Sequence, residues 1–208
     1  MNRFKSWPVL LLMVVMAIGC ATTPKAQNAG LADSLPGAPK WLINGCTAYW
    51  DNQDEKKLCG VGVGSDSSRV AAMKRVVANA NARSEISRNL SVKVKSMLMD
   101  YQATIANELA FSAAATDEQY IVKTSEQIIE QSLSDIEPSE TWSSKDGTLF
   151  VLVVLDVDRF KAKVTEMNML SKSLRQAIVE WADKSFLDLN KELQKHPNIP
   201  PAPTTGKL

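Results

Sequence analysis

Apolar residues recur every three or four positions over three long stretches of the chain, which is the spacing of one face of an α-helix. These stretches predict helices over residues 67–112, 117–134 and 159–195. The first has one irregular step, from Ala80 to Ile86, where either the apolar face rotates or the helix breaks. The residues of this helix predicted to face the core are Val70, Met73, Val77, Ala80, Ile86, Leu90, Val94, Met97, Tyr101, Ile105 and Leu109.

Two other segments have the pattern of β-strands. Glycines alternate with apolar residues over residues 57–64, and residues 149–155 are an unbroken apolar run, as expected for a central strand covered on both faces. The turn Asp146-Gly147 precedes this run and joins it to a short strand around Trp142, because Asp-Gly between strand-like segments favours a hairpin. Strand, long helix, helix, hairpin and long helix together indicate the α+β class.

The start of the chain has the pattern of an export signal. A basic start, Met1–Lys5, precedes about a dozen apolar residues, Trp7–Ile18, too few for a bilayer core that needs roughly 20. The sequence Ala17-Ile18-Gly19-Cys20 then resembles the lipobox of bacterial lipoproteins. Because a thiol is the nucleophile that takes up diacylglycerol, we predict cleavage between Gly19 and Cys20 and lipid on Cys20. The alternatives are an ordinary signal peptide and a cytosolic chain with an apolar start.

Two flanking segments have little to bury. Residues 20–38 are rich in Ala, Thr, Pro, Gly and Asn and predict a flexible tether between lipid and domain. Residues 196–208 hold four prolines and predict a disordered tail. The predicted organisation is therefore a signal peptide over residues 1–19, the tether, a domain over residues 39–158, a C-terminal helix over residues 159–195 and the tail.

The charge of the mature chain is nearly balanced. Removing residues 1–19 takes away Arg3 and Lys5, so lysine plus arginine falls from 24 to 22 against 23 acidic residues, a net charge near −1. A chain without a basic surplus has little electrostatic attraction for nucleic acid, so we expect no nucleic-acid partner.

Cys46 and Cys59 are the cysteines left once Cys20 carries lipid. Export places them where disulfides persist, and a bridge would close a loop of about 14 residues, worth roughly 3 kcal/mol in the chain-entropy model. The alternative is two reduced, buried cysteines that act as small apolar residues. Two cysteines and the single histidine, His196, do not make a convincing zinc site, so no metal is expected.

A series of features in fixed order resembles a known family. After the lipobox and tether come Pro39-Lys40-Trp41, the glycine strand running into a helix, the run Ala78–Ile86, Trp142 and the strand end Leu155-Asp156. In this order they resemble the LPP-twenty lipoprotein family over residues 39–160. The resemblance implies a small strand-helix-strand-strand domain with a three-stranded antiparallel sheet, attachment to the outer membrane and no known catalysis. Some relatives are associated with flagellar assembly or the cell surface.

The glycine-rich turn is the best candidate for a ligand site. Backbone N–H groups at a helix N-terminus attract anions, but the G-x-G-x-G spacing matches neither the dinucleotide fingerprint nor a P-loop. The alternative is that the glycines let a helix or an aromatic ring pack closely on the strand. The residues of this candidate turn are Gly60, Gly62, Gly64 and Ser65.

No residue pattern of an active site stands out. The polar run in the long helix, which holds Asn79, Asn81, Arg83 and Glu85, is predicted to be a solvated or intersubunit face. No serine or cysteine has an identifiable base beside it in the sequence. We therefore predict that the protein is not an enzyme and uses no cofactor.

The apolar stripe of the C-terminal helix predicts an interface. From Phe160 it spans about 34 residues, or roughly 50 Å at 1.5 Å per residue, which is longer than a small three-stranded sheet. Part of it is therefore predicted to be exposed in a monomer or to pack on another chain. The alternative is that the helix bends back onto the helix over residues 67–112. The residues predicted to form the interface are Trp181, Phe186, Leu189 and Leu193.

Together these patterns predict a non-catalytic envelope lipoprotein, held on the membrane by lipid on Cys20, that acts through a protein partner or self-association. Because Ala21 and not Asp follows the cysteine, we expect it at the outer membrane, facing the periplasm. The alternative function is binding of a small ligand or glycan at the glycine-rich turn.

Overall fold

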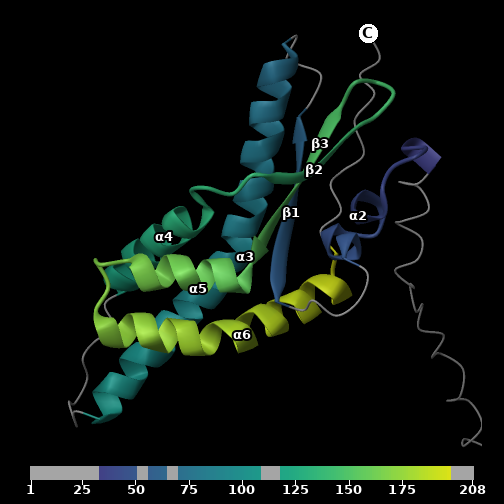
Figure 1. The fold of residues 1–208 in the computed structure, drawn as a ribbon. Helices are drawn as coiled ribbons and strands as arrows, with labels where there is room; N and C mark the ends of the chain where they lie inside the picture. Colours follow the sequence, from purple (N-terminus) through teal and green to yellow (C-terminus); the bar gives the residue numbers. More distant parts are fainter. Residues whose placement is uncertain (1–32, 51–55, 65–69, 109–117, 198–208) are drawn as a thin grey trace, which may run out of the picture.

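One antiparallel sheet lies at the centre of the residues that the computed structural model describes, which are 33–50, 56–64, 70–108 and 118–197. Its three strands are β1 (Lys57–Gly64), β2 (Pro138–Ser143) and β3 (Leu149–Asp156), in the order β1-β3-β2 (Figure 1). The apolar run is the central strand and the Asp-Gly turn joins it to β2. The predicted hairpin and the α+β class are therefore confirmed.

Helices cover one face of the sheet. α3 (Ala71–Glu108) runs along β1 and continues beyond it, and α4 (Glu118–Leu133), α5 (Val157–Glu166) and α6 (Lys172–Lys195) lie beside its C-terminal half (Figure 1). α3 and α4 match the first two predicted helices to within a few residues. Within the described ranges, no helix has both the length and the apolar character needed to span a membrane.

β3 is buried on both faces because its side chains alternate between two cores. Val151, Val153 and Leu155 belong to the large core formed with α3, α4, α5 and α6. Phe150 and Leu152 point the other way, into a smaller core. The unbroken apolar run thus reflects two covered faces, as predicted.

The smaller core is closed by residues 33–50, which we call the cap. It contains α2 (Lys40–Ile43) and the short 3-10 helix η1 (Cys46–Tyr49). Leu35 is only 3% exposed, so the folded part begins before the predicted boundary at residue 39. Residues 20–32 of the predicted tether lie outside the described residues. The cap residues buried against the sheet are Leu35, Trp41, Leu42 and Cys46.

α3 is continuous, so the irregular step in its apolar spacing reflects a rotation of the buried face. In its first turns the predicted core face is wrong, because close packing on the glycines of β1 admits only small side chains. Ala78 and Ala82 are buried there, and the exposed residues are Val70, Met73, Val77 and Ala80. Farther along, the predicted residues Ile86, Leu90, Val94 and Met97 are buried.

The predicted C-terminal helix is two helices. α5 ends at Glu166, and Ser171 caps α6 by accepting a hydrogen bond from Leu174 N at 3.2 Å. The intervening turn lets α6 fold back, so that the rings of Phe160 and Phe186 lie 5.2 Å apart between centroids.

The predicted interface on this helix is therefore wrong, and the alternative of a helix that folds back is correct. The prediction assumed one straight helix that could pack only on the sheet. Instead, the helix can also pack along α3, which is 38 residues long. Of the four predicted interface residues, Trp181 is partly buried against the large core, and buried within it are Phe186, Leu189 and Leu193.

Candidate functional site

The space over the three glycines of β1 is filled by helix backbone. A Cβ built at Gly62 would lie 1.8 Å from the carbonyl oxygen of Ala78, and at Gly60 and Gly64 the nearest backbone oxygen of α3 would be 2.3 Å away. No ligand fits on this face, so the ligand-site prediction for Gly60, Gly62 and Gly64 is wrong. Ser65, the fourth predicted residue, lies outside the described residues.

The outer edge of β1 is closed by two polar side chains of α3. β1 pairs with β3 along its other edge. At the outer edge, Val61 N donates to Glu85 Oε2 at 2.6 Å, and Asn81 Nδ2 donates to the carbonyl oxygen of Val63 at 2.8 Å. These bonds replace those of a neighbouring strand. The predicted solvated face is therefore wrong at Glu85, which is buried, and Asn81, although exposed, is bonded to the sheet.

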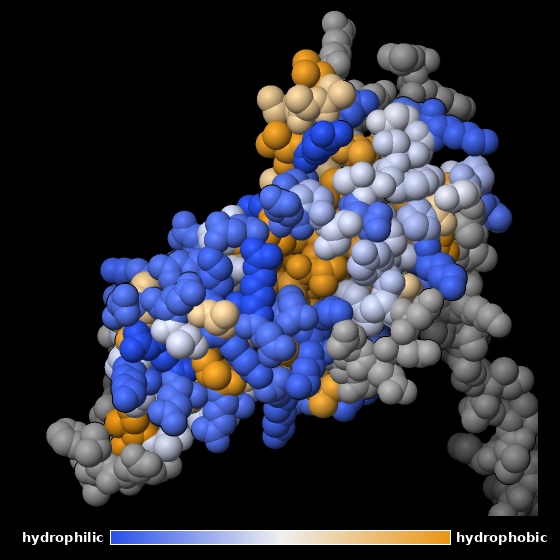
Figure 2. Space-filling view, viewed as in Figure 1, coloured by the Kyte–Doolittle hydropathy of each residue, from blue (hydrophilic) through white to orange (hydrophobic). Residues whose placement is uncertain are grey.

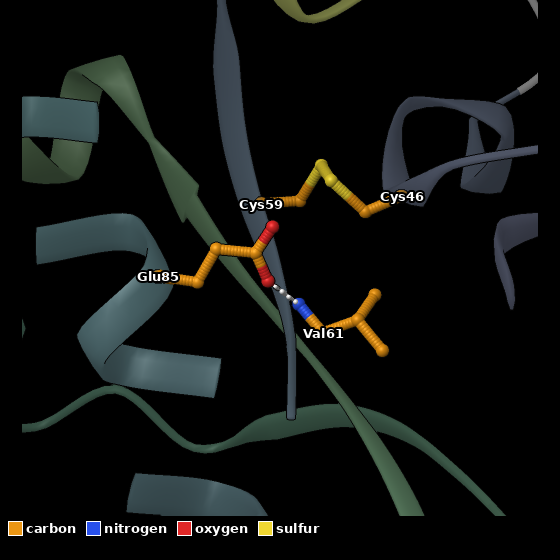
Figure 3. The surroundings of a disulfide bond; sticks show 4 residues. All are labelled: Cys46, Cys59, Val61 and Glu85. Carbon is orange, nitrogen blue, oxygen red and sulfur yellow. Dashed lines mark hydrogen bonds between the residues drawn. A yellow bond between two sulfur atoms is a disulfide. The ribbon is translucent and has the colours of Figure 1, made fainter. Parts of the chain in front are cut away.

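A disulfide joins the cap to β1 on the face of the strand that is turned away from α3 (Figure 3). Cys46 in η1 and Cys59 in β1, the two cysteines that the sequence pairs, have Cα atoms 5.8 Å apart. Glu85 reaches β1 from one side and Cys46 from the other (Figure 3). β1 is thus held between α3 and the cap, and these contacts stabilise the fold without forming an open site.

An exposed apolar surface lies along α3. Six of the nine exposed large apolar side chains among the described residues belong to this helix or directly precede it. Figure 2 shows apolar surface gathered over the upper end of the molecule, where α3 begins. We call this set the exposed α3 surface, with exposed fractions between 38% and 64%: Val70, Met73, Val76, Val77, Val92 and Met99.

A groove lined mostly by serines and charged residues lies between α3 and α4, beside this surface. It encloses about 640 Å³, and its lining includes Ser84, Arg88 and Lys95 from α3 and Glu126 and Glu130 from α4. Within the described part of the chain, none of these four charged side chains has a hydrogen bond or ion pair. Cations stand on one wall and carboxylates on the other, so the groove offers both signs of charge to a binding partner.

The lowered pKa values of two aspartates arise from contacts with lysines. A hydrogen bond from Lys161 lowers the pKa of Asp183, and Lys56 acts in the same direction. A hydrogen bond and the charge of Lys163 lower the pKa of Asp135. Among the described residues, no three histidine, cysteine, aspartate or glutamate side chains lie together in a way that could hold a metal ion.

Sequence reasoning missed both the exposed α3 surface and the groove. The spacing of Val70, Met73 and Val77 is helical, and periodicity alone cannot tell a core face from a binding face. One signal was present in the chain. A strand with a glycine at every second position needs a helix face of small residues against it, and Ala78 and Ala82 supply that face.

A comparison with protein families matches the part of the chain that carries these features. The family model described as LPP20 lipoprotein matches residues 39–156. The matched range holds the whole sheet, α3 and α4, and ends before α5 and α6. No curated protein and no solved structure matches the chain.

Proposed function

Because the chain belongs to the LPP20 lipoprotein family, we propose that it is a lipid-anchored envelope protein that acts by binding protein and not by catalysis. The family match supports an envelope lipoprotein, and the lipobox-like sequence supports Cys20 as the anchor. Ala21 after that cysteine supports the outer membrane as the location, and the proposed orientation is toward the periplasm.

The anchor is tested with the variant Cys20→Ser. The wild-type protein takes up labelled palmitate in growing cells, whereas the variant takes up none and keeps its signal peptide, because serine lacks the thiol that is acylated. The measurements are autoradiography and the mass of the purified chain. Label in the variant would rule out Cys20 as the site.

The observation that carries the proposed function is the exposed α3 surface. Exposing apolar side chains to water is unfavourable by roughly 25 cal/mol per Å² of apolar area. A set of exposed apolar side chains on one helix is therefore typical of a surface that a binding partner covers. The adjoining groove favours a polypeptide partner, because a polypeptide can present both a carboxylate to Arg88 and Lys95 and a cation to Glu126 and Glu130.

The alternative, a small ligand or glycan at the glycine-rich turn, loses its support from the structure. Gly60, Gly62 and Gly64 face the backbone of α3 at distances that leave no space for a bound molecule.

The binding function is tested by placing a charge on the exposed α3 surface. Val77→Asp changes a side chain that is 38% exposed, and the matched control Met169→Asp changes one that is 48% exposed between α5 and α6. After chemical crosslinking of intact cells, the wild type and the control give adducts of higher mass, and Val77→Asp loses them. Thermal unfolding of the purified variants shows that both are folded. Unchanged adducts in Val77→Asp would overturn the proposal.

A further inference from the structure

A line of apolar and small residues runs along the uncovered side of α3. Its positions are spaced alternately three and four residues apart, which is the spacing at which one helix packs along another. All of these side chains are exposed or half-buried in the part of the chain that the structure describes. We call this line the α3 seam, and its residues are Val70, Met73, Val77, Ala80, Ser84, Ser87 and Ser91.

The two halves of the α3 seam differ in character. The first half is apolar and belongs to the surface where α3 begins (Figure 2). The second half holds only alanine and serine, so a second helix can come close to α3 there. At Ser84, Ser87 and Ser91 the seam also forms one wall of the groove of about 640 Å³ between α3 and α4. The seam thus continues from an open apolar surface into a groove.

The serines of the seam can be covered without loss of hydrogen bonds. The hydroxyl of Ser84 donates to the carbonyl oxygen of Ala80 at 2.9 Å, and the hydroxyl of Ser91 donates to that of Arg88 at 2.8 Å. Because both donors are paired within α3, an apolar side chain packed on them leaves no donor unsatisfied. The second half of the seam is therefore suited to the same kind of partner as the first.

Charged residues flank the seam at the groove. Arg88 and Lys95 each follow a seam serine by four residues, which is a position where paired helices exchange charges. Across the groove, α4 presents Glu126 and Glu130. Among the described residues, none of these four side chains has a hydrogen bond or an ion pair. All four charges are therefore available to a partner.

The period of the seam favours a helix as that partner. Positions spaced by three and four residues recur about every 5 Å along α3, at 1.5 Å per residue. The apolar face of a second helix has the same period. An extended strand instead presents side chains on one face roughly every 7 Å, so it cannot stay in step with the seam.

We propose that the α3 seam binds an amphipathic α-helix of a protein partner, which lies along α3 over about 32 Å, from Val70 to Ser91. This inference rests on the proposed function, because it names the kind of segment that covers the exposed α3 surface. The partner helix faces the seam with apolar residues. It carries carboxylates on the flank toward Arg88 and Lys95 and cations on the flank toward α4.

The first test reads the conformation of the partner from three positions of the seam. Val70, Val77 and Ser84 are replaced, one at a time, by the photoreactive amino acid p-benzoylphenylalanine in the full-length protein, and intact cells are irradiated. We expect all three to attach to one partner protein. Mass spectrometry should place the attachment points of the first and the last position about 14 residues apart, because both helices rise 1.5 Å per residue.

An extended partner gives a different result in the same measurement. A strand covers the same distance in about six residues, so attachment points that close would overturn the helix. Attachment to peptides of this protein itself would show a second copy and also overturn the proposal. The control places the photoreactive residue at Met169, which is 48% exposed between α5 and α6, and should give no adduct with the partner.

The second test reverses a charge beside the seam. In the protein with the photoreactive residue at Ser84, Arg88→Glu should lower the yield of the adduct roughly fivefold, because a carboxylate then faces the carboxylates of the partner. Arg88→Lys should keep the yield. The matched control Lys172→Glu, at an exposed position of α6, should also leave it unchanged. Equal yields with Arg88→Glu and Arg88→Lys would overturn the proposed charge pairing.

The outcomes separate this inference from the proposed function. If Val77→Asp removes the chemical adducts but the three photoreactive positions share no partner helix, protein binding stands and the helix along the seam is wrong. If Val77→Asp changes no adduct and no photoreactive position attaches to a protein, both are wrong. One partner, attached at points about 14 residues apart and weakened by Arg88→Glu, supports both.

Discussion

The absence of a side chain at Gly62 sets how closely α3 lies on β1. A Cβ there would come 1.8 Å from the carbonyl oxygen of Ala78 and 2.4 Å from Ala82 N, and both atoms belong to helix backbone. Gly62→Ala therefore pushes α3 away and opens the large core. We expect the free energy of unfolding to fall by at least about 3 kcal/mol, measured by urea denaturation.

Gly37→Ala is the matched control for this change. Gly37 has a φ of +83°, and nothing lies within 4 Å of an added Cβ, so only the left-handed backbone conformation is penalised. We expect a loss of about 1 kcal/mol. Equal losses in the two variants would contradict the contact between β1 and α3 as the cause.

Asn190 is a buried polar residue that is expected to lower the stability of the protein. It is 1% exposed in α6, and neither atom of its amide has a hydrogen-bond partner among the described residues. A buried amide without partners costs about 1–3 kcal/mol, and leucine favours a helix more than asparagine does. We expect Asn190→Leu to raise the free energy of unfolding by about 1–2 kcal/mol in a denaturant titration.

The exposed residue Asn168 supplies the control for Asn190. Asn168→Leu lies between α5 and α6 and should change the free energy of unfolding by no more than about 0.5 kcal/mol. If Asn190→Leu instead destabilises the protein, the amide is satisfied by a group such as an ordered water, and the explanation fails.

At the scale of the elements, the cap depends on its bond to β1. The cap is short, and it packs on β1 and β3 with few apolar residues. Replacing Cys46 and Cys59 together with alanine keeps these positions apolar and removes the bridge. We expect the free energy of unfolding to fall by about 3 kcal/mol, because the unfolded chain regains the freedom of a loop of about 14 residues.

A reductant provides the control for the bridge. It should lower the denaturation midpoint of the wild-type protein to that of the double alanine variant and leave the variant itself unchanged. A wild-type midpoint that does not respond to the reductant would show that the bond does not contribute to stability.

The elements themselves could be predicted where one physical requirement dominated. The unbroken apolar run of β3 requires two covered faces, and the Asp146-Gly147 turn requires a hairpin, so both follow from the sequence. The first turns of α3 could not be assigned from periodicity, because Val70 and Met73 have helical spacing but the glycines of β1 decide which face is buried. The break before Ser171 was missed because a serine within an apolar stripe is also compatible with a continuous helix.

For the whole molecule, Asp183 connects three parts of the fold. From α6 it pairs with Lys161 of α5 and with Lys56, directly before β1, at 3.1 Å. The hydrogen bond from Lys161 holds the pKa of Asp183 below its usual value near 4. The stabilisation is therefore fully present above the pKa of the unfolded chain and is lost as the pH falls through the lower pKa of the folded state.

We expect the thermal midpoint of the wild-type protein to fall as the pH drops below about 4. Asp183→Asn should be less stable near neutral pH and lose less on acidification. Part of the acid sensitivity should persist in this variant, because the pKa values of Asp135 and Asp146 are lowered as well. A variant with the same pH profile as the wild type would show that Asp183 makes no net contribution.

The candidate site is formed by helices that come together only in the folded protein, and this explains why the sequence did not reveal it. The groove needs α3 and α4 side by side, and Lys95 and Glu126 are far apart along the chain. The exposed α3 surface becomes visible only once the opposite face of the helix is known to lie on β1. Cys20 is the contrasting case, because its predicted lipidation rests on a local sequence pattern and requires no folded structure.

The bond between Cys46 and Cys59 also has a mechanical consequence. Any pull from a lipid at Cys20 enters the described domain at the cap, which holds to the sheet by side-chain contacts that could be peeled away one after another. The disulfide carries the load past those contacts and into β1, whose backbone is paired with β3 from Lys57 to Gly64. In the oxidised protein, the cap therefore cannot leave the domain unless β1, at the edge of the sheet, separates from the central strand β3. In the reduced protein, the cap can come away from the sheet while the pairing of β1 with β3 stays intact.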